Sequence, residues 1–359
     1  MAAPPLVGRS RETGEITALL ESLPERGGTL VIRGEPGIGK SALLTHARMV
    51  AAERGLVVMS AAGVQSEARL PFAGLHRLLR PVLAHADHLA PLQRNALMAA
   101  FGMIDAPGPD LYLIAMAALG VLSDAAGRAP IVLLVEDAHW LDRPSSDALA
   151  FVGRRVESDP IILLAAIRDG YEDSPLGSGL PELLLDRLAD QPAGELLSEH
   201  FPDLAPSVRE RLLDEAAGNP LALLELPLAL GSGGREGEVV LPSNLPVTAR
   251  LEQAFASRAA ELPVATRAVL RVAAVDDGEA LAEVLSAAEI VIGTRQTVEA
   301  LVPAIEAQLV EVDGHAIRFR HPLVRSAIHQ AASVAERHAA HAALAEVLSH
   351  DPDRHVWHR

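Results

Sequence analysis

The sequence contains no cysteine, and only one of its 31 lysine and arginine residues, Lys40, is a lysine. Without cysteine there can be neither a disulfide framework nor a thiolate metal site, and the composition fits a reducing compartment. No run of eighteen apolar residues occurs, which argues against a membrane span. The N-terminus, MAAPPLVGRS, has neither the basic start nor the apolar core of a signal peptide. We therefore predict a cytoplasmic chain with no membrane partner.

Aromatic residues make up only 3% of the chain, whereas hydrophobic residues together make up 49%. The core must therefore be built from Leu, Val, Ile and Ala, and 359 residues suffice for two to three domains. The formal net charge is −16. Because so acidic a surface repels phosphate backbones, these residues are poor candidates for binding DNA or RNA by themselves.

Continuous apolar runs in the first half of the chain predict buried strands at 29–33, 56–60, 131–135 and 161–167. Helical patterns separate these runs, and they cover 40–53, 72–125 (with breaks at Pro81, Pro91 and 106–110) and 145–156. Continuous apolar strands that alternate with helices indicate a parallel sheet covered on both faces. The predicted fold class is α/β, with a doubly wound parallel sheet.

The pattern changes after about Glu199, where helical signals continue to Leu230. The glycine-rich segment 231–238 predicts a flexible loop, and helices follow at 247–260 and 263–274. The apolar runs 307–312 and 316–319 flank Asp313-Gly314, a strong hairpin signal. Helices followed by a hairpin resemble a winged-helix module. An alanine-rich helical segment, 321–350, comes next.

Gly34–Ser41 reads GEPGIGKS and matches the phosphate-loop pattern G-x-x-x-x-G-K-[ST]. Its glycines let the backbone curl so that successive N–H groups face phosphate oxygens, and the helix that begins near Lys40 adds its positive end. Lys40 can neutralise the β- and γ-phosphates, and the Ser41 hydroxyl can bind Mg²⁺. We predict ATP or ADP with Mg²⁺ as the ligand, held by Pro36, Gly37, Ile38, Gly39, Lys40, Ser41 and Ala42. The guanine-recognition motif N-K-x-D cannot occur in a chain whose one lysine lies in the P-loop, so adenine is preferred.

Two acids, Glu136 and Asp137, directly follow the third predicted strand. A P-loop needs an acid on a neighbouring strand to hold the water shell of the metal. Glu136 would approach Mg²⁺ at the carboxyl end of the strand, directly or through water, and Asp137 could act as the general base for the attacking water. Because Glu is longer than the Asp usual at the metal position, the two roles could be shared or exchanged, and the sequence leaves this open.

The fourth predicted strand ends in Arg168. A guanidinium at that point would lie beside the γ-phosphate, where it could report whether the phosphate is present and stabilise transferred charge. The predicted catalytic residues are Lys40, Glu136, Asp137 and Arg168.

With these elements in order, the chain resembles the STAND class of signal-transduction ATPases within the AAA-like P-loop group. More narrowly, it resembles the ATPase portion of the large ATP-binding LuxR-type transcription regulators, to which the maltose-regulon activator is related. The resemblance covers residues 6–359. It rests on the opening LVGRSRE, the P-loop, VEDAHWLD with its His139-Trp140 pair, Arg168, GNPLAL at 218–223 and RFRHPLVRSAI at 318–328.

The resemblance implies further roles. The backbone of Val7, Gly8 and Arg9 would lie along adenine, Pro220 would pack against the adenine, and His321 would touch the β-phosphate of ADP. It also implies a domain division, namely a tail at 1–5, an ATPase core at 6–199, a helical lid at 200–261, a winged-helix-like domain at 262–330 and a helical arm at 331–359.

By the same resemblance, the expected function is a nucleotide switch that is closed with ADP and open with ATP, hydrolyses ATP slowly and self-associates in the ATP state. DNA and inducer would be bound through a helix-turn-helix and a repeat sensor that this sequence does not contain, so we expect a fragment of a longer regulator. The alternatives are a mechanical AAA-type ATPase and a non-hydrolysing, ADP-bound scaffold of another signalling protein.

Histidine pairs spaced i,i+3 occur at His85/His88, His338/His341 and His355/His358. Without a thiolate partner or an H-E-x-x-H motif, solvated helix faces are favoured over zinc sites. No nucleophile-elbow motif supports a serine hydrolase.

Overall fold

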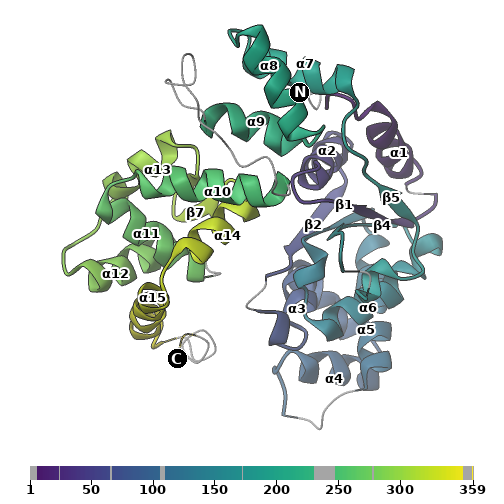
Figure 1. Cartoon of the computed structure of the whole chain (residues 1–359). Coiled ribbons are helices and arrows are strands. Elements are labelled where there is room, and N and C mark those ends of the chain that lie inside the picture. The colour runs from purple at the N-terminus through teal and green to yellow at the C-terminus, as the bar shows by residue number, and fades with distance from the viewer. Residues whose placement is uncertain are drawn as a thin grey trace. The chain divides into compact units, whose positions relative to one another are not determined.

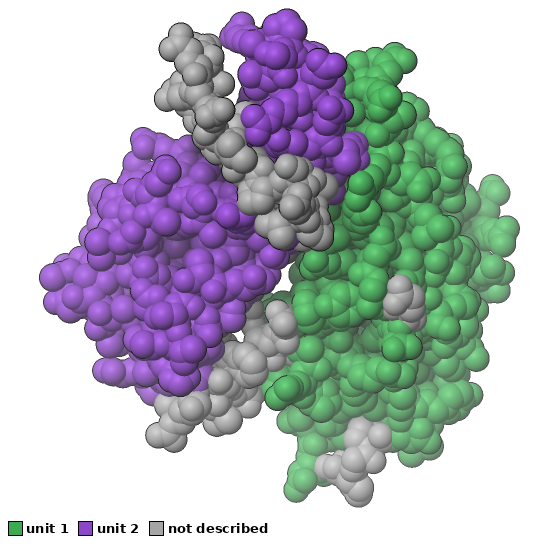
Figure 2. Space-filling view, in the orientation of Figure 1, with its two compact units in different colours: residues 1–195 green, residues 196–359 purple. Residues whose placement is uncertain are grey.

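The structure is a computed structural model that describes residues 6–23, 25–64, 67–105, 110–171, 173–229, 247–276, 279–350 and 358. The predicted tail at 1–5 and the predicted flexible loop at 231–238 lie outside these residues. The chain forms two compact units, residues 1–195 and 196–359, coloured separately in Figure 2.

The first unit is built on a five-stranded parallel sheet with the strand order β2-β3-β4-β1-β5. Its strands are β1 (Gly28–Gly34), β2 (Val57–Ala62), β3 (Ile131–Glu136), β4 (Ile161–Arg168) and β5 (Glu182–Leu184). The first four confirm the strands predicted from apolar runs. The sequence missed β5, because three residues with one buried side chain leave no pattern to detect.

The strand order corrects one expectation. The acids after β3 were expected on a strand next to the P-loop strand, but β4 lies between β1 and β3. A helical crossover between parallel strands can pass over a neighbouring position, and the sequence does not encode which position the strand takes.

Helices cover both faces of this sheet (Figure 1). On one face, α1 (Ser10–Glu21) and α2 (Lys40–Glu53) pack on alternate strand residues such as Leu134. On the other face, residues such as Val135 pack against α3 (Ala73–Leu79), α4 (Pro91–Ala100), α5 (Leu111–Ala126) and α6 (Arg143–Gly153). Because successive strand side chains point to opposite faces, the next residue, Glu136, is directed toward the α2 side.

The region predicted as helical at 72–125 contains a 3₁₀ segment. At the predicted break around Pro81, residues Arg80–His88 form the 3₁₀ helix η2 rather than an α-helix. The helix predicted at 145–156 starts and ends earlier, as α6. The other short 3₁₀ helices of this unit are η1 (Glu67–Arg69), η3 (Ala138–Trp140), η4 (Val156–Ser158) and η5 (Pro175–Gly177).

The second unit is helical with one hairpin. The helix α7 (Asp190–His200) leads the chain into it. The further helices are α8 (Pro206–Ala216), α9 (Pro220–Ala229), α10 (Val247–Ala260), α11 (Val264–Val275), α12 (Leu281–Ile292), η7 (Val298–Leu301), α13 (Val302–Glu306), α14 (Pro322–Ala331) and α15 (Val334–Val347). Among these, α11 packs against α12, α14 and α15, and α10 packs against α9 and α14.

The predicted hairpin is present, formed by β6 (Val310–Asp313) and β7 (Ala316–Phe319). Its turn lies one residue later than predicted, because Asp313 still pairs with Ala316 and the loop is Gly314-His315. Gly314 has a φ of 56°, a backbone conformation that glycine adopts without a steric penalty. In the parts of the chain described, no helix is both long enough and apolar enough to cross a membrane.

Candidate nucleotide site

The P-loop runs from the end of β1 to the start of α2, as the sequence predicted. Gly34, Gly37 and Gly39 have φ angles of 157°, 78° and 110°. These values carry the backbone through a tight curl that residues with a Cβ rarely adopt. Ser41 and Ala42 follow in the exposed first turn of α2. The loop therefore presents the start of this helix, with its N–H groups, beyond the carboxyl edge of the sheet.

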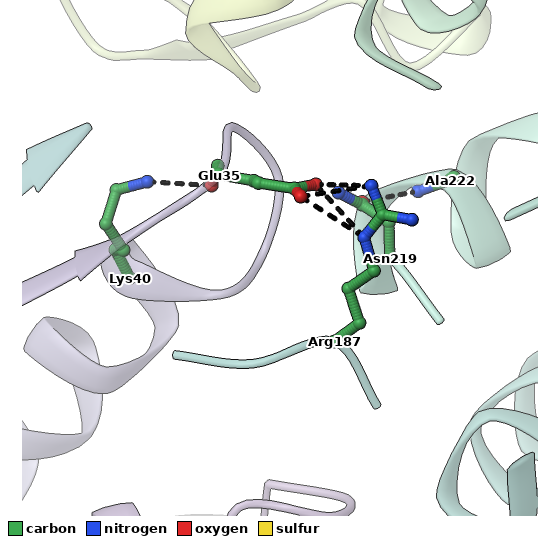
Figure 3. Close-up of polar contacts among 5 residues, drawn as sticks. All are labelled: Glu35, Lys40, Arg187, Asn219 and Ala222. Carbon is green, nitrogen blue, oxygen red and sulfur yellow. Dashed lines mark hydrogen bonds and ion pairs between the residues drawn. The ribbon is translucent and has the colours of Figure 1, made fainter. Parts of the chain in front are cut away.

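The Lys40 side chain folds back over the loop that precedes it. Its Nζ donates hydrogen bonds to the carbonyl oxygen of Gly34 at 2.7 Å and to that of Glu35 at 2.8 Å, the second of which is drawn in Figure 3. Lys40 is only 8% exposed, and this burial lowers its pKa to about 8, opposed by the charges of Asp137 and Asp169. The ammonium is thus desolvated where phosphate oxygens would compete with two carbonyls for it.

Asp137, Arg168 and Asp169 gather around this ammonium. The residue Arg168 ends β4 and pairs in register with Gly34, and the backbone N–H of Asp169 donates to the Gly34 carbonyl at 3.2 Å. Asp137 comes from the end of β3, on the other side of β4. All three influence the Lys40 charge. The strand order thus brings Asp137 and Arg168 to the P-loop, although β3 is not paired with β1.

Glu136 and Asp137 occupy different surroundings. Glu136 lies 3.8 Å from Arg48 of α2, measured from Oε1 to Nη2. Burial raises its pKa, and Arg48 opposes the rise. Asp137 has a left-handed backbone with a φ of 43°. Burial raises the pKa of its carboxyl too, opposed by Lys40 and Arg168. Asp137 is therefore the acid that interacts with the P-loop lysine, while Glu136 faces the flank of α2.

Two residues not predicted as part of the site shape the turn after β3. The Gly63 N–H donates to the Glu136 carbonyl at 2.8 Å, and a Cβ at Gly63 would lie 2.2 Å from the Asp137 carbonyl oxygen. Asp142, which is 2% exposed, accepts hydrogen bonds from the backbone N–H groups of Phe72, Gly74 and Ser145. The N-cap pattern of an acid before Arg-Pro-Ser-Ser was visible in the sequence, but its bonds to the start of α3 were not.

His139, two residues after Asp137, is near enough to Arg168 and Lys40 to be affected by their charges. Its ring contacts those of Trp140 and Tyr171, with centroid distances of 5.1 and 4.6 Å. Burial, assisted by Arg168 and Lys40, lowers the pKa of His139 to about 4. Its Nδ1 is buried without a hydrogen-bond partner among the described residues. The imidazole is therefore neutral near pH 7, with one polar atom free to accept or donate a bond.

Arg9 and Gly8 lie in the segment before α1, where Arg9 contacts the P-loop and Gly8 packs against Pro192. Arg9 is 6% exposed and donates to the carbonyl oxygens of Ile38 at 3.0 Å and Asp186 at 2.8 Å. A Cβ on Gly8 would lie 2.6 Å from that of Pro192. The Arg9 side chain thus ties the loop to the segment after β5. The backbone contact of Arg9 and of half-buried Val7 with adenine stays a prediction.

A further residue that sequence reasoning missed, Arg187, follows β5 and forms a bidentate ion pair with Glu35 of the P-loop (Figure 3). Its Nε and Nη2 lie 3.0 to 3.2 Å from both carboxylate oxygens. No local signal links residues so far apart in sequence.

The other two predicted nucleotide contacts lie in the second unit. Pro220 is the first residue of α9, whose Ala222 N–H bonds the Asn219 side chain at 3.2 Å. Half-buried His321 is the N-cap of α14, and its Nδ1 accepts a bond from the Leu323 N–H at 3.0 Å. Each thus has a local helix-starting role, and its contact with a nucleotide stays a prediction.

The donor set at the loop fits magnesium. The Ser41 hydroxyl stands exposed at the start of α2, and the half-buried Glu136 carboxylate is directed toward the α2 face. Hydroxyl and carboxylate oxygens, supplemented by phosphate oxygens and water, are what Mg²⁺ prefers.

Comparison with known proteins agrees with this geometry. Residues 5–164 match the AAA ATPase domain family. A curated relative, an uncharacterised protein of Rhizobium meliloti (strain 1021), is 25% identical over 98% of this chain and 38% of its own length. This chain thus spans about two fifths of that relative.

Among solved structures, a Signal Transduction ATPase with Numerous Domains (STAND) protein with a tetratricopeptide repeat sensor, from Pyrococcus horikoshii, is similar at a TM-score of 0.58. It shares 18% identity over 99% of this chain and 48% of its own. The Walker-type ATPase of Pyrococcus abyssi matches 90% of this chain and 95% of its own, at 16% identity and a TM-score of 0.42. Residues 5–164 of the first unit are thus similar to an AAA ATPase domain of the P-loop type.

Proposed function

We propose that this chain is a signal-transduction switch that binds ATP or ADP and hydrolyses ATP slowly with Mg²⁺. The observation that carries the proposal is the meeting of Lys40, Asp137 and Arg168 beyond the carboxyl ends of β1, β3 and β4. Two cations and one carboxylate converge where the P-loop would hold a triphosphate. This arrangement suits binding of the γ-phosphate and activation of a water molecule.

Each residue of the site would have a separate role in hydrolysis. Lys40 and Arg168 neutralise charge on the β- and γ-phosphates, and Asp137 accepts a proton from the water that attacks the γ-phosphorus, so that ADP and phosphate are released. Ser41 and Glu136 would hold Mg²⁺, directly or through water, and the metal would supply charge neutralisation when bound. The raised pKa of Asp137 makes it a stronger base than an exposed aspartate.

The second unit would turn nucleotide state into a structural change. We propose that its lid (200–261), winged-helix-like part (262–330) and arm (331–359) complete the switch of the ATPase core (6–199). Pro220 would contact adenine, and His321, at the start of α14, would contact the β-phosphate of ADP. ADP would favour a closed form, and ATP an open form that self-associates. A ligand shifts such a balance only by its differential affinity for the two forms.

The likeness of fold to a STAND protein with a repeat sensor supports a signalling role. We further propose that the parent protein is a LuxR-type regulator, in which segments outside this sequence bind DNA and an inducer. A mechanical ATPase would instead show fast turnover stimulated by a polymer, and a scaffold would hold ADP without turnover.

The decisive experiment denatures the purified protein and identifies the released nucleotide, followed by single-turnover hydrolysis of added ATP. We expect stoichiometric ADP, and turnover slow enough to be followed over minutes. Absence of bound nucleotide together with no ATP binding on titration would reject the proposal.

Variants separate the roles. Lys40→Ala should abolish nucleotide binding. Asp137→Asn should lower the hydrolysis rate by about 10²-fold or more while ATP stays bound, and Glu136→Gln should raise the Mg²⁺ concentration needed. Asp147→Asn, which removes a partly buried carboxylate of α6 that pairs with Arg143, is the matched control and should leave both the hydrolysis rate and the Mg²⁺ requirement unchanged. If Glu136→Gln stops hydrolysis at saturating Mg²⁺ and Asp137→Asn does not, the two acids have exchanged roles.

A further inference from the structure

A second cluster of ligating side chains lies away from the nucleotide site, between η2 and α5. Among the residues that the structure describes, His85, His88 and Asp124 form a group of three metal-ligating side chains, whose ligand atoms all lie within 4.8 Å of one another. The Asp124 Oδ2 lies 2.5 Å from Nδ1 of His85 and 2.8 Å from Nδ1 of His88. From this geometry we infer that the three side chains form a binding site for a divalent transition-metal ion of the zinc type.

The 3₁₀ conformation of η2 aligns the two histidines. With three residues per turn, side chains at i and i+3 lie directly above one another. His85 and His88 have this spacing, and their ring centroids lie 6.1 Å apart. In an α-helix the same two residues would be offset by about 60° around the axis. The 3₁₀ geometry thus directs both Nδ1 atoms to one carboxylate.

The packing of η2 on α5 sets the position of Asp124. Gly120 of α5 allows close approach, because a Cβ there would lie 2.7 Å from Cδ2 of Leu89, the residue after η2. Asp124 is one helical turn beyond Gly120 and lies on the same face. The buried residues Val82 and Ala86 fix the inner side of η2. The three ligands are therefore held by two packed elements.

The exposure of the three side chains suits a site filled from solution. The His85 side chain is 15% exposed and thus anchored, whereas those of His88 and Asp124 are 56% and 39% exposed. Two imidazoles and one carboxylate are the ligand types of three-ligand zinc sites, in which water takes the fourth position. Donors bound to one tetrahedral Zn²⁺ lie roughly 3.3 Å apart, so the Asp124 oxygen needs to move only slightly away from the two imidazole nitrogens that it now contacts at 2.5 and 2.8 Å.

The test is zinc binding by tag-free protein stripped with EDTA, without nucleotide, followed by competition with a chromophoric zinc chelator. The variants are Asp124→Asn and His85→Gln. The matched control is Asp87→Asn, which removes another carboxylate of the same 3₁₀ helix. The Asp87 carboxylate pairs with Arg94 at 3.0 Å and not with a histidine. Far-UV circular dichroism and melting in EDTA establish that all variants fold alike before metal is added.

We expect wild type and Asp87→Asn to bind one zinc equivalent that Asp124→Asn and His85→Gln lose or bind at least about tenfold more weakly. Zinc should raise the melting temperature of only the first two proteins. The inference is overturned if wild type binds no zinc, or if Asp124→Asn and His85→Gln bind it as well as wild type does. The predicted ATP site is built around Lys40, and the three zinc ligands lie elsewhere. The outcome of the zinc test is therefore independent of the proposed switch.

Discussion

Arg187 and Glu35 form an ion pair in which Nε and Nη2 each lie within 3.2 Å of both carboxylate oxygens. Glu35 lies in the P-loop, and its carbonyl accepts a hydrogen bond from Lys40. The segment after β5 therefore holds the loop at two places, through this pair and through the Arg9 bond to Asp186.

Breaking this pair should loosen the loop without unfolding the unit. The Arg187 and Glu35 side chains are 45% and 42% exposed, so solvent screens the attraction. We expect Arg187→Ala to lower the free energy of unfolding by less than about 1 kcal/mol, and a double-mutant cycle with Glu35→Ala to give a coupling of the same size. Hydrogen exchange of the loop amides should accelerate in Arg187→Ala. A coupling above about 2 kcal/mol would show that the pair is structural.

Nucleotide binding should take up protons near pH 8. Because the pKa of Lys40 is lowered to about 8, about half of its side chains are neutral at that pH. The negative charge of a triphosphate favours the ammonium and raises this pKa. Calorimetry in buffers of different ionisation enthalpy should show uptake of up to about half a proton at pH 8 and almost none at pH 6.5.

The control for this experiment is Lys40→Arg, because a guanidinium stays charged throughout this range. Equal proton uptake at pH 6.5 and pH 8 in wild type would contradict the assignment to Lys40.

Acidification should destabilise the chain through His139. The pKa of this side chain is about 4 in the folded state and 6.5 without the fold. Between these values the unfolded chain binds more protons, so this contribution to stability is present above about pH 6.5 and is lost as the pH falls toward 4. The full difference is at most roughly 3 kcal/mol before solvent screening.

Urea unfolding at pH 7 and pH 5 measures this effect. The neutral variant His139→Gln should lose less stability than wild type between the two values, by about 1 to 2 kcal/mol. If wild type and variant lose the same amount, His139 is not a major source of the acid sensitivity.

A methyl group at position 63 should disturb the turn that carries the two acids. A Cβ at Gly63 would lie 2.2 Å from the Asp137 carbonyl oxygen and 2.8 Å from the Leu141 nitrogen. These are backbone atoms that cannot rotate away, so we expect Gly63→Ala to cost about 2 kcal/mol or more in stability and to lower the hydrolysis rate.

The matched variant Gly14→Ala places the same methyl group in α1, where no atom lies within 4 Å. It should be neutral or stabilise the chain by roughly 0.5 to 1 kcal/mol. Thermal unfolding compares the two variants, and similar melting temperatures would show that the turn adjusts to a side chain at Gly63.

The sequence by itself determined the features that depend on neighbouring residues. The run Gly34–Ser41 predicted the phosphate loop and the start of α2 at Lys40, because its glycines and lysine act within one turn of backbone. Apolar runs predicted four of the five strands of the sheet, together with the acids and the arginine at the ends of β3 and β4. The Asp-Gly signal found the hairpin, but placed its turn one residue early.

Only the tertiary structure decided which of these elements meet. The insertion of β4 between β1 and β3 brings Arg168 into register with Gly34 and still leaves Asp137 within reach of Lys40. Arg187 pairs with Glu35, and Asp124 pairs with two histidines for which the sequence favoured a solvated helix face. In both cases the partners are far apart in the sequence and share no local pattern. Strand order and helix packing depend on how much apolar surface the whole chain buries. A short stretch of sequence does not reveal this, because the contacts come from residues far apart in the chain.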